Sequence, residues 1–393
     1  MLSKDENGRL IDYINKVVND ENSKPEIIRN LKTAQDLIKQ QKYTKANKMI
    51  MKILEINPFN HNALYLLSIL YYAQKNYMLA LKLIERAINI SPDNYWNYII
   101  KSSICHSSYL MNYDEDAMAL AKQSIRAAVD IAPMQFEVRE QAGLIYLSAN
   151  ALDEAKEEFE KALSIKPGDE RCNYFFSALS GKNIDKAPKQ YVENLFDEYA
   201  IKYDQHLTFV LQSSVPISIV DNIEKIANPE QKYKILDLGS GTGLVGEYLL
   251  KKGNIKFVID GVDISGKMVN IAKSKNIYNN VTKAEISSYL TEINDQYDIV
   301  TASDVMIYIG ELEPIFAMVK KILVKNGYFI FSTEDSESQE GFELKKTLRY
   351  GFSDKYITDL AQKYGLNIIS KAHQFLRKDK DEGISGTIYT IKN

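Results

Sequence analysis

Small and apolar residues recur along the first half of the chain in a spacing that predicts paired helices. Four prolines, Pro58, Pro92, Pro133 and Pro167, lie 34, 41 and 34 residues apart. Upstream of each proline, small or apolar residues return at the same three offsets of 12, 8 and 5 positions. Positions spaced by three and four share one face of a helix. A period near 34 residues that carries such a stripe indicates an array of repeated helix pairs.

The pattern divides the first half into four repeats, at about residues 27–60, 61–94, 95–135 and 136–169. The 41-residue unit keeps its register if seven extra residues lie near 110–116. Each repeat buries its apolar face only against its neighbours, so the ends of the array need caps. We expect one capping helix within residues 1–25 and another at 170–180, followed by a polar linker at 181–188. The predicted repeat domain spans residues 1–182.

A different pattern begins near residue 233. A short apolar run, Ile235 to Leu238, is followed by Gly239, Gly241 and Gly243 and then by an amphipathic stretch. This order predicts a buried strand, a tight glycine turn and a helix N-terminus, where a ligand can approach the backbone closely. Twenty residues after Gly243, a second apolar run ends in Asp263, an offset suited to binding ribose hydroxyls.

The same turn fits the dinucleotide pattern GxGxxG, so a nicotinamide cofactor is the alternative. Asp237 at the end of the first strand argues against it, because a pyrophosphate would be repelled there. Like charges about 4 Å apart cost roughly 4 kcal/mol at an effective dielectric of about 20. S-adenosylmethionine carries an ammonium and a sulfonium instead, which a carboxylate attracts. The residues therefore favour the cationic cofactor.

The sequence ILDLGSGTG at 235–243, together with GVDIS at 261–265, resembles Rossmann-like (class I) S-adenosylmethionine-dependent methyltransferases. More narrowly, the chain is similar to bacterial methyltransferases that carry N-terminal tetratricopeptide repeats. The resemblance implies an all-α tetratricopeptide solenoid followed, at residues 183–393, by a Rossmann-like domain. Its mostly parallel seven-stranded sheet would close with an antiparallel hairpin near 366–376 and 384–392, a feature of methyltransferases rather than dinucleotide dehydrogenases.

Further expected strands lie near 281–286 and 327–333, and the stretch 297–308 is expected to be a strand that runs into the loop above the sheet. Helices are expected at 312–323 and 356–364. Alternating strands and helices predict a parallel sheet whose ligands bind at the carboxyl ends of its strands. The resemblance implies a set of cofactor-binding residues at these ends and in the segment before the first strand: Tyr199, Tyr203, Asp237, Gly239, Ser240, Gly241, Gly243, Asp263, Ile264, Met268, Glu285 and Ser303. Plain packing is the alternative for the two tyrosines.

Methyl transfer is an in-line displacement, in which the protein chiefly aligns the reactants. A general base is needed only where the nucleophile arrives protonated. The candidate catalytic residues are Asp304, Tyr308 and Arg349, with Glu334 and Asp335 as further bases at the strand ends. In the repeat-bearing family, the segment around Arg349 usually carries a histidine where this chain has Phe352.

Composition limits the remaining classes. The net charge is −3 with a pI near 6.0, so no bulk positive field indicates a nucleic-acid partner. Two cysteines inside helical patterns favour a reducing, cytoplasmic location, and we expect neither a signal peptide nor a membrane span. The four histidines are scattered, which gives no metal-ligand spacing.

Aromatic residues at the first-helix positions of the repeats suggest a peptide-binding groove, and Tyr65, Tyr72 and Trp96 are its predicted anchors. Packing between helices is the alternative. The leading hypothesis is a methyltransferase whose repeats dock a protein or peptide. The alternatives are a small-molecule methyltransferase whose repeats serve assembly, and a scaffold that binds the cofactor without turnover.

Overall fold

The computed structural model describes residues 25–379 and 382–393, so the helix expected within residues 1–25 lies outside the described part. The chain divides into two compact units, one reaching to Phe176 and the other beginning at Ser177. Each is described by itself below. None of the described helices combines the length and the apolar character needed to cross a bilayer.

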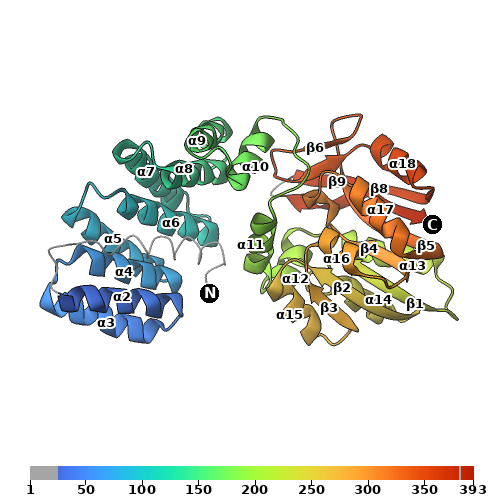
Figure 1. The fold of residues 1–393 in the computed structure, drawn as a ribbon, viewed down its shortest axis with the longest axis horizontal. Coiled ribbons are helices and arrows are strands. Elements are labelled where there is room, and N and C mark those ends of the chain that lie inside the picture. Colours follow the sequence, from blue (N-terminus) through green and yellow to red (C-terminus); the bar gives the residue numbers. More distant parts are fainter. Residues whose placement is uncertain (1–24, 380–381) are drawn as a thin grey trace. The chain divides into compact units, whose positions relative to one another are not determined.

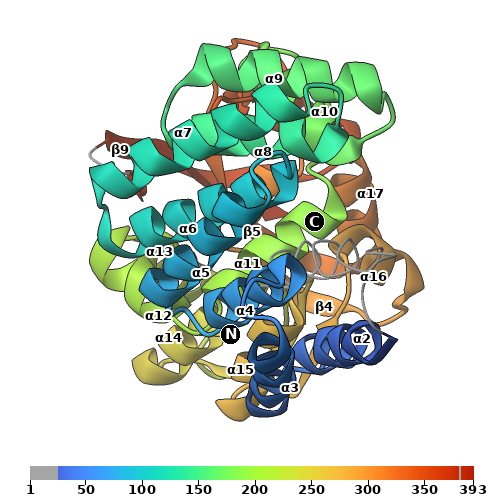
Figure 2. The ribbon, with the colours of Figure 1, turned by 90° about the vertical axis from the view of Figure 1, so that its left-hand side faces the viewer.

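Paired helices follow one another through the first unit (Figures 1 and 2). The pairs are α2 (Pro25–Lys39) with α3 (Tyr43–Ile56), α4 (His61–Ala73) with α5 (Tyr77–Ile90), α6 (Tyr95–Asn112) with α7 (Glu115–Ile131), and α8 (Phe136–Ser148) with α9 (Leu152–Ile165). A last helix, α10 (Glu170–Leu179), begins in the first unit and ends in the second. The predicted repeats and the C-terminal capping helix are thus helices at the expected places.

The 41-residue repeat accommodates its extra length by extending both of its helices. Helix α6 has 18 residues where α4 has 13, and α7 has 17 where α5 has 14. The turn between α6 and α7 is left-handed at Tyr113, with φ of 54°. The additional residues therefore form helix rather than a loop, and the register of the following repeat is kept.

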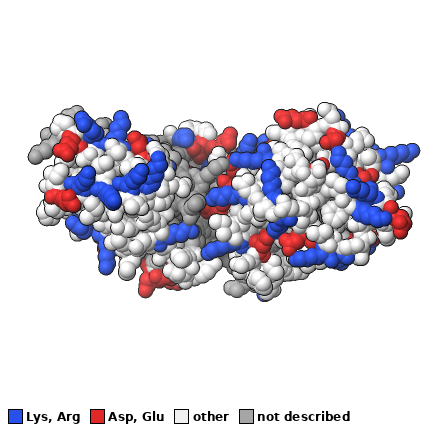
Figure 3. All heavy atoms as spheres, turned by 90° about the horizontal axis from the view of Figure 1, so that it is seen from below, with Lys and Arg blue, Asp and Glu red and all other residues white. Residues whose placement is uncertain are grey.

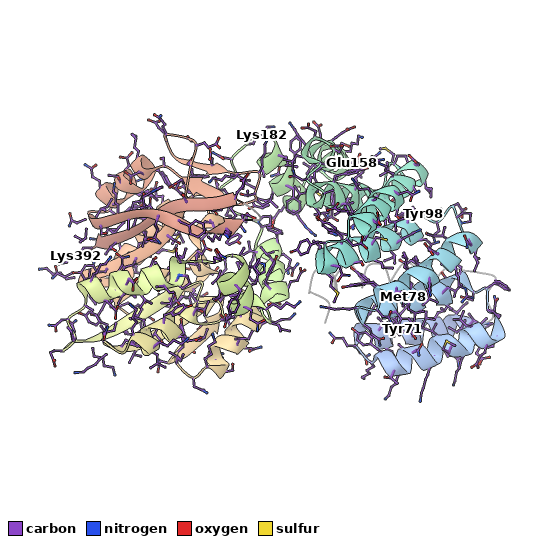
Figure 4. All side chains as sticks on the ribbon, turned by 180° about the vertical axis from the view of Figure 1, so that it is seen from behind. Tyr71, Met78, Tyr98, Glu158, Lys182 and Lys392 are labelled. Carbon is purple, nitrogen blue, oxygen red and sulfur yellow. The ribbon has the colours of Figure 1, made fainter. Side chains whose placement is uncertain are left out.

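The interior of the repeats consists of the small and apolar residues that define the period. Ala46, Ala80, Ala121 and Ala155 are fully buried. A methyl group at Gly143 would lie 2.6 Å from the ring of Phe159, so only glycine lets α8 and α9 pack this closely. A buried ion pair joins the same two helices, because Arg139 Nη1 lies 2.7 Å from Glu158 Oε2; Glu158 is labelled in Figure 4.

The three aromatic residues predicted to anchor a ligand in an open groove are buried. Tyr65, Tyr72 and Trp96 are 2%, 5% and 7% exposed. The Tyr72 hydroxyl lies 3.0 Å from Ser107 Oγ, which belongs to the first helix of the next repeat. Their exposure as groove anchors is therefore not borne out, and the structure agrees with packing between helices. The physical reason is that first-helix positions of successive repeats face one another across the stack.

The second unit is built on one mixed sheet. Its strands are β1 (Lys232–Leu238), β2 (Lys256–Asp263), β3 (Asn280–Lys283), β4 (Tyr297–Ala302), β5 (Leu323–Asp335), β6 (Phe342–Leu344), β7 (Tyr350–Phe352), β8 (Asn367–Asp379) and β9 (Glu382–Lys392). The path β3-β2-β1-β4-β5 is parallel, and β9 pairs antiparallel with β5 and β8. The order reverses next to β1, which places the carboxyl ends of β1 and β4 at a switch point where ligands bind.

Helices cover both faces of this sheet (Figure 1). They are α11 (Lys189–Tyr199), α12 (Tyr203–Gln205), α13 (Val215–Ile226), α14 (Leu244–Lys252), α15 (Gly266–Ser274), α16 (Ile286–Glu292), α17 (Glu313–Ile322) and α18 (Asp354–Lys363), with a π-helical turn at His206–Val210 and a 3-10 turn at Met306–Tyr308. A core of aliphatic side chains from α13 and α14 packs on Ile235, Ile259 and Ile299. On the other side, Phe316 of α17 packs edge-on against Phe329 and Phe331 of β5.

The sheet differs from the expected seven strands. The described part of the sheet has nine, because the short hairpin of β6 and β7 extends from the end of β5. The strand expected at 281–286 ends at Lys283, and Glu285 instead caps helix α16. Positive and negative side chains are interspersed on the face shown in Figure 3, in keeping with the small net charge.

Candidate functional site

A pocket lies at the carboxyl ends of the central parallel strands. Its walls come from the loops after β1, β2, β3 and β4 and from the segment 186–203. The residues that line it are Lys186, Ala187, Lys189, Val192, Phe196, Tyr203, Gly239, Gly241, Asp263, Ile264, Glu285, Ile286, Ser287, Ser288, Ser303, Asp304, Val305, Tyr308 and Ile309.

The turn after β1 is built from three glycines in the left-handed region. Gly239, Gly241 and Gly243 have φ of 65°, 54° and 88°, a conformation that other residues adopt only with strain. A methyl group at Gly239 would lie 2.3 Å from a side-chain carbon of Val305. Glycine therefore lets the turn pack on the loop after β4 and leaves backbone exposed to the pocket.

Asp237 does not line the pocket. Its carboxylate accepts hydrogen bonds from the hydroxyls of Tyr278 and Thr301, at 2.7 and 2.8 Å. The Tyr278 hydroxyl in turn accepts from the amide of Gly246 in α14, at 3.2 Å. Burial raises the pKa of Asp237 to about 6, against the effect of these hydrogen bonds. Asp237 was expected to attract a cationic ligand directly. In the structure its carboxylate instead binds the hydroxyls of Tyr278 and Thr301 beneath the glycine turn.

Asp263 does line the pocket, at the end of β2. Its two oxygens accept hydrogen bonds from the amides of Gly241 and Ser265, both at 2.8 Å. Burial raises its pKa to about 6, although these amides act in the opposite direction. Each carboxylate oxygen has a further lone pair, so the group can still accept from a ligand hydroxyl. The bond to Gly241 also ties the glycine turn to the end of β2.

The loop after β3 forms a second wall. Glu285 lines the pocket and caps α16, accepting from the amide of Ser288 at 2.9 Å. One carboxylate oxygen of Glu285 is therefore used in the helix cap. Ile264 and Ile286 give this wall an apolar surface, and Ser287 and Ser288 add hydroxyls. Such a mixture suits a flat heteroaromatic ring with polar edges.

The loop after β4 carries a charged group held in a fixed position. Asp304 has a left-handed backbone, with φ of 60°, and its amide donates to Ser332 Oγ at 2.8 Å. Its carboxylate pairs with Arg377 of β8, which also binds Glu334 of β5. Arg377 is 1% exposed. The carboxylate of Asp304 therefore serves as the counter-ion of a buried guanidinium.

Three aromatic rings, those of Phe196, Tyr203 and Tyr308, line the same pocket as Asp304. Phe196 packs edge-on against Tyr308, with ring centres 5.2 Å apart, and also against Tyr203. Burial raises the pKa of Tyr203, and nearby Asp304 adds to the rise. Burial also raises the pKa of Tyr308, although Arg349 and Arg377 act in the opposite direction. Both phenols consequently stay protonated, so each has a proton that it can donate to a ligand.

Helices α11 and α12 cover the pocket and are fixed to its loops by three carboxylates. Glu193 binds Lys283 at 2.8 Å. Asp197 accepts from the hydroxyl of Ser265, at 2.5 Å, and from the amide of Lys267 at the start of α15. We call these two helices, residues 189–205, the cover.

The third of these carboxylates is Asp204. It accepts from the hydroxyl of Thr242 in the glycine turn and pairs with Lys275 at 2.8 Å. Lys275 also binds Glu247 of α14 at 2.8 Å. The cover is therefore attached to the loops after β1 and β2, to the end of α15 and to the last residue of β3.

The structure brings most of the predicted site residues together and leaves others apart. Those that line the pocket are Tyr203, Gly239, Gly241, Asp263, Ile264, Glu285, Ser303, Asp304 and Tyr308. Those that do not are Tyr199, Asp237, Ser240, Gly243, Met268 and Arg349. Tyr199 is 41% exposed and lies against His206, whereas Met268 is fully buried in α15.

Two of the residues outside the lining still contact it. Arg349 pairs with Asp379 at 2.5 Å, and its guanidinium lies near enough to the hydroxyl of Tyr308 to lower the pKa of that phenol. The hydroxyl oxygen of Ser240 is buried in the glycine turn and has no partner in the described part of the chain. It packs closely on β2, because a methyl group at Gly261 would lie 2.9 Å from this oxygen.

The sequence pattern does not reveal several lining residues, above all Lys186, Ala187, Lys189, Val192 and Val305. The segment 181–188 reads as a linker because it is polar and ends in proline. No local signal distinguishes a polar linker from a polar strap that pairs with a distant loop. Phe196 does leave a signal, since it begins the segment that holds Tyr199 and Tyr203.

Comparison with known families agrees with this architecture. Residues 211–371 match the family described as a methyltransferase domain. Residues 31–95 and 136–169 match tetratricopeptide repeat families.

Several curated relatives match part of the chain. Malonyl-[acyl-carrier protein] O-methyltransferase of Bacillus anthracis is 23% identical over 181 residues, which cover 45% of this chain and 65% of the relative. Ubiquinone biosynthesis O-methyltransferase of Pasteurella multocida is 26% identical over 124 residues, covering 28% of this chain and 50% of the relative. The chain thus spans between half and just under two thirds of these relatives.

Among solved structures, magnesium protoporphyrin IX methyltransferase of Synechocystis is 15% identical, with a TM-score of 0.41. The match covers 52% of this chain and 99% of that structure. A methyltransferase of Leishmania major is 17% identical, with a TM-score of 0.43, and the match covers 60% of this chain and 91% of that structure.

Proposed function

Because the chain carries tetratricopeptide repeats followed by a class I methyltransferase domain, we propose that it transfers a methyl group from S-adenosylmethionine to the carboxylate of a small acyl substrate. The cofactor, when bound, supplies an electrophilic methyl group. In this reaction an oxygen of the substrate carboxylate would bond to the methyl carbon while the carbon–sulfur bond of the sulfonium breaks, giving a methyl ester and S-adenosylhomocysteine.

The residues around the turn fit the cofactor. Asp263 can accept from the ribose hydroxyls, and the wall of Ile264, Glu285 and Ile286 can hold the adenine. The carboxylate of Asp263 makes no ion pair among the described residues, so it can complement the positive charge of a cationic donor.

The observation that carries the choice of substrate is the state of the acidic groups in the lining. Asp304 is bound to Arg377, Asp263 to two backbone amides, and Glu285 to the cap of α16. Tyr308 and Tyr203 have raised pKa values and keep their protons. In the described part of the pocket, every candidate base is thus engaged or protonated.

A pocket of this kind suits a nucleophile that arrives without its proton. The pKa of an ordinary carboxyl group is about 4, so it is ionised at neutral pH and needs no base. The phenols of Tyr203 and Tyr308 can donate hydrogen bonds to its oxygens, with Arg349 supporting Tyr308 from behind. Alignment of the reactants can then supply about 7–11 kcal/mol of the barrier reduction. The names of the relatives, which include malonyl-[acyl-carrier protein] O-methyltransferases, support the same class of substrate.

A matched set of three thioesters tests the proposal. The N-acetylcysteamine thioesters of malonate, 3-hydroxypropionate and β-alanine present a carboxylate, a hydroxyl and an ammonium on similar chains. Incubation with the full-length protein and S-adenosylmethionine, followed by mass spectrometry, should give a methyl ester from the first alone. Methylation of the hydroxyl or the amine instead would contradict the proposal, because a base would then have to be present.

Protein methylation is the second candidate, and the repeats favour it, since such repeats commonly bind other proteins. Label from tritiated S-adenosylmethionine in a host lysate should enter the small-molecule fraction if the acyl substrate is correct. Label confined to the protein fraction would favour a substrate that the repeats dock.

A further inference from the structure

Residues 183–187, which we call the strap, contribute to the wall of the pocket near Tyr308 and are not a free linker. It follows Lys182, which is labelled in Figure 4. The side chain of Asn183 donates to the carbonyl of Phe342 at 2.7 Å and accepts from the amide of Leu344 at 2.8 Å. The side-chain amide of Asn183 thus binds one carbonyl and one N–H group of β6.

The remainder of the strap pairs with the loop that follows β4. The amide of Glu311 donates to the carbonyl of Asp185 at 2.8 Å, and Lys186 forms an antiparallel bridge with Ile309. The amide of Ala187 donates to the carbonyl of Tyr308 at 3.3 Å. These bonds hold the strap against the loop that carries Tyr308.

Gly310 shows how closely the strap approaches this loop. A methyl group there would lie 2.6 Å from the ring of Tyr350, 2.7 Å from that of Phe342 and 2.9 Å from the carbonyl oxygen of Asp185. Any larger residue would push the strap away from the pocket. The position of Lys186 is therefore determined by pairing on both sides of it.

Lys186 has an exposed side chain and lines the pocket together with its bridge partner Ile309. Paired residues of an antiparallel bridge project to the same side, which agrees with both facing the pocket. Within the described residues, its ammonium makes no ion pair. Lys189, at the start of α11, is the other lysine of the lining and also has an exposed side chain. Five further cations near the pocket are bound to carboxylates: Lys275 to Asp204 and Glu247, Lys283 to Glu193, Lys345 to Glu334, Arg349 to Asp379, and Arg377 to Asp304 and Glu334.

We infer that Lys186 is a specificity-determining residue, which the strap presents to an anionic group of the substrate beside Tyr308. The inference rests on the proposed function, because it supplies the cation that selects an ionised acyl substrate. A lysine ammonium is a compact point charge on a flexible stem, so it attracts a carboxylate without fixing its orientation. The phenol of Tyr308 would provide the directed hydrogen bond. Charge selection and orientation are thus divided between the strap and the loop after β4.

Binding to the full-length protein saturated with S-adenosylhomocysteine tests this without any turnover. Malonate and its uncharged diamide, malonamide, are the probes, and isothermal titration measures both. The parent should prefer malonate. Lys186→Glu should lower the affinity for malonate by about tenfold or more, because an attraction becomes a repulsion. The affinity for malonamide should not change. Lys186→Gln should lie between, and Lys186→Arg should retain most of the preference.

Two control variants separate this site from a general electrostatic field. Lys225→Glu makes the same change of net charge on α13, at an exposed lysine outside the pocket lining, and should not affect malonate. Lys189→Gln removes the other lysine of the lining, at the start of α11, and should have a smaller effect than Lys186→Gln. A parent that binds both probes alike, or equal losses from the variants at 186 and 189, would overturn the inference. If malonate binds through Lys186 but no carboxylate is methylated, the proposed function fails while the anion site remains.

Discussion

Arg377 of β8 lies between Asp304 and Glu334 and binds both carboxylates while it is almost completely buried. Asp304 belongs to the loop after β4 and Glu334 to the end of β5, so the guanidinium joins three parts of the sheet. The pair with Asp304 is also the reason why this pocket residue does not act as a free base. A single side chain from the C-terminal hairpin thus holds the pocket residue Asp304 in place.

Replacing Arg377 by methionine should destabilise the protein strongly. The change leaves Asp304 and Glu334 buried without their shared cation, and removal of one partner from a buried ion pair costs about 3–5 kcal/mol. Urea unfolding with a fluorescence readout measures the loss. Lys355→Met is the matched control, because that lysine is paired with Asp359 and Glu340 at the surface and should change stability by less than about 1 kcal/mol. A small effect at Arg377 would mean that water reaches the two carboxylates.

The sequence predicted the repeats and the glycine turn because both are local patterns. Ala46, Ala80, Ala121 and Ala155 recur with the period of the repeats, and each begins a stripe of small or apolar residues at helical spacing that predicts the second helix of its repeat. Gly239, Gly241 and Gly243 likewise indicate a turn, since their left-handed backbone depends on their own residue type. Patterns of this kind need no knowledge of distant contacts.

The remaining features depend on contacts between segments far apart in the chain. A ligand contact was expected at Asp237, but its side chain lies outside the pocket lining and binds the hydroxyls of Tyr278 and Thr301. Lys186 lies in a polar stretch that resembles a linker, and only its bridge to Ile309 makes it part of the pocket. Neither relationship leaves a trace in the spacing of residues along the chain.

The attachment of the cover to the glycine turn predicts an effect on the lifetime of the bound cofactor. Asp204→Asn should weaken the bonds to Thr242 and Lys275, and hydrogen bonds to charged groups are worth about 1.5–3 kcal/mol. Dissociation of S-adenosylhomocysteine, followed by stopped-flow displacement, should therefore accelerate about tenfold or more. Asp221→Asn provides the control, since it removes a bond to Lys252 on the surface away from the pocket. An unchanged rate in Asp204→Asn would show that the cover does not limit release.

The strap predicts how far the catalytic domain can be shortened from its N-terminus. A chain that begins at Lys182 keeps Asn183, the bridge of Lys186 and the bond from Ala187 to Tyr308. A chain that begins at Lys189 loses all of them and should melt at a lower temperature. Both should bind S-adenosylhomocysteine, because Asp263 and the glycine turn are intact. Calorimetry measures the melting temperatures of the two chains. Equal temperatures would mean that residues 183–187 do not stabilise the domain and are only a linker.

The raised pKa of Asp263 predicts that cofactor affinity depends on pH. In the folded protein this pKa is about 6, above the value of about 3.9 in an unfolded chain. The unliganded protein therefore binds more protons than the unfolded chain between about pH 4 and 6, and its stability falls as the pH rises through that window.

A bound ribose reverses the preference, because its hydroxyls donate to the ionised carboxylate. Affinity for S-adenosylhomocysteine should consequently rise between about pH 5 and 7, by up to about tenfold for each pH unit below the pKa of the free protein. Titration calorimetry at several pH values, with the ionic strength held constant, measures the slope. Asp263→Asn should bind more weakly and lose most of this dependence.

Asp237→Asn is the control that makes the assignment specific. The pKa of Asp237 is also raised to about 6, but its carboxylate faces Tyr278 and Thr301 rather than the pocket. This variant should therefore keep the rise in affinity between about pH 5 and 7, even if its overall affinity drops because the glycine turn is less well supported. If Asp237→Asn abolishes the pH dependence and Asp263→Asn preserves it, the ribose contact assigned to Asp263 is wrong, and the proton that cofactor binding displaces belongs to the group beneath the turn.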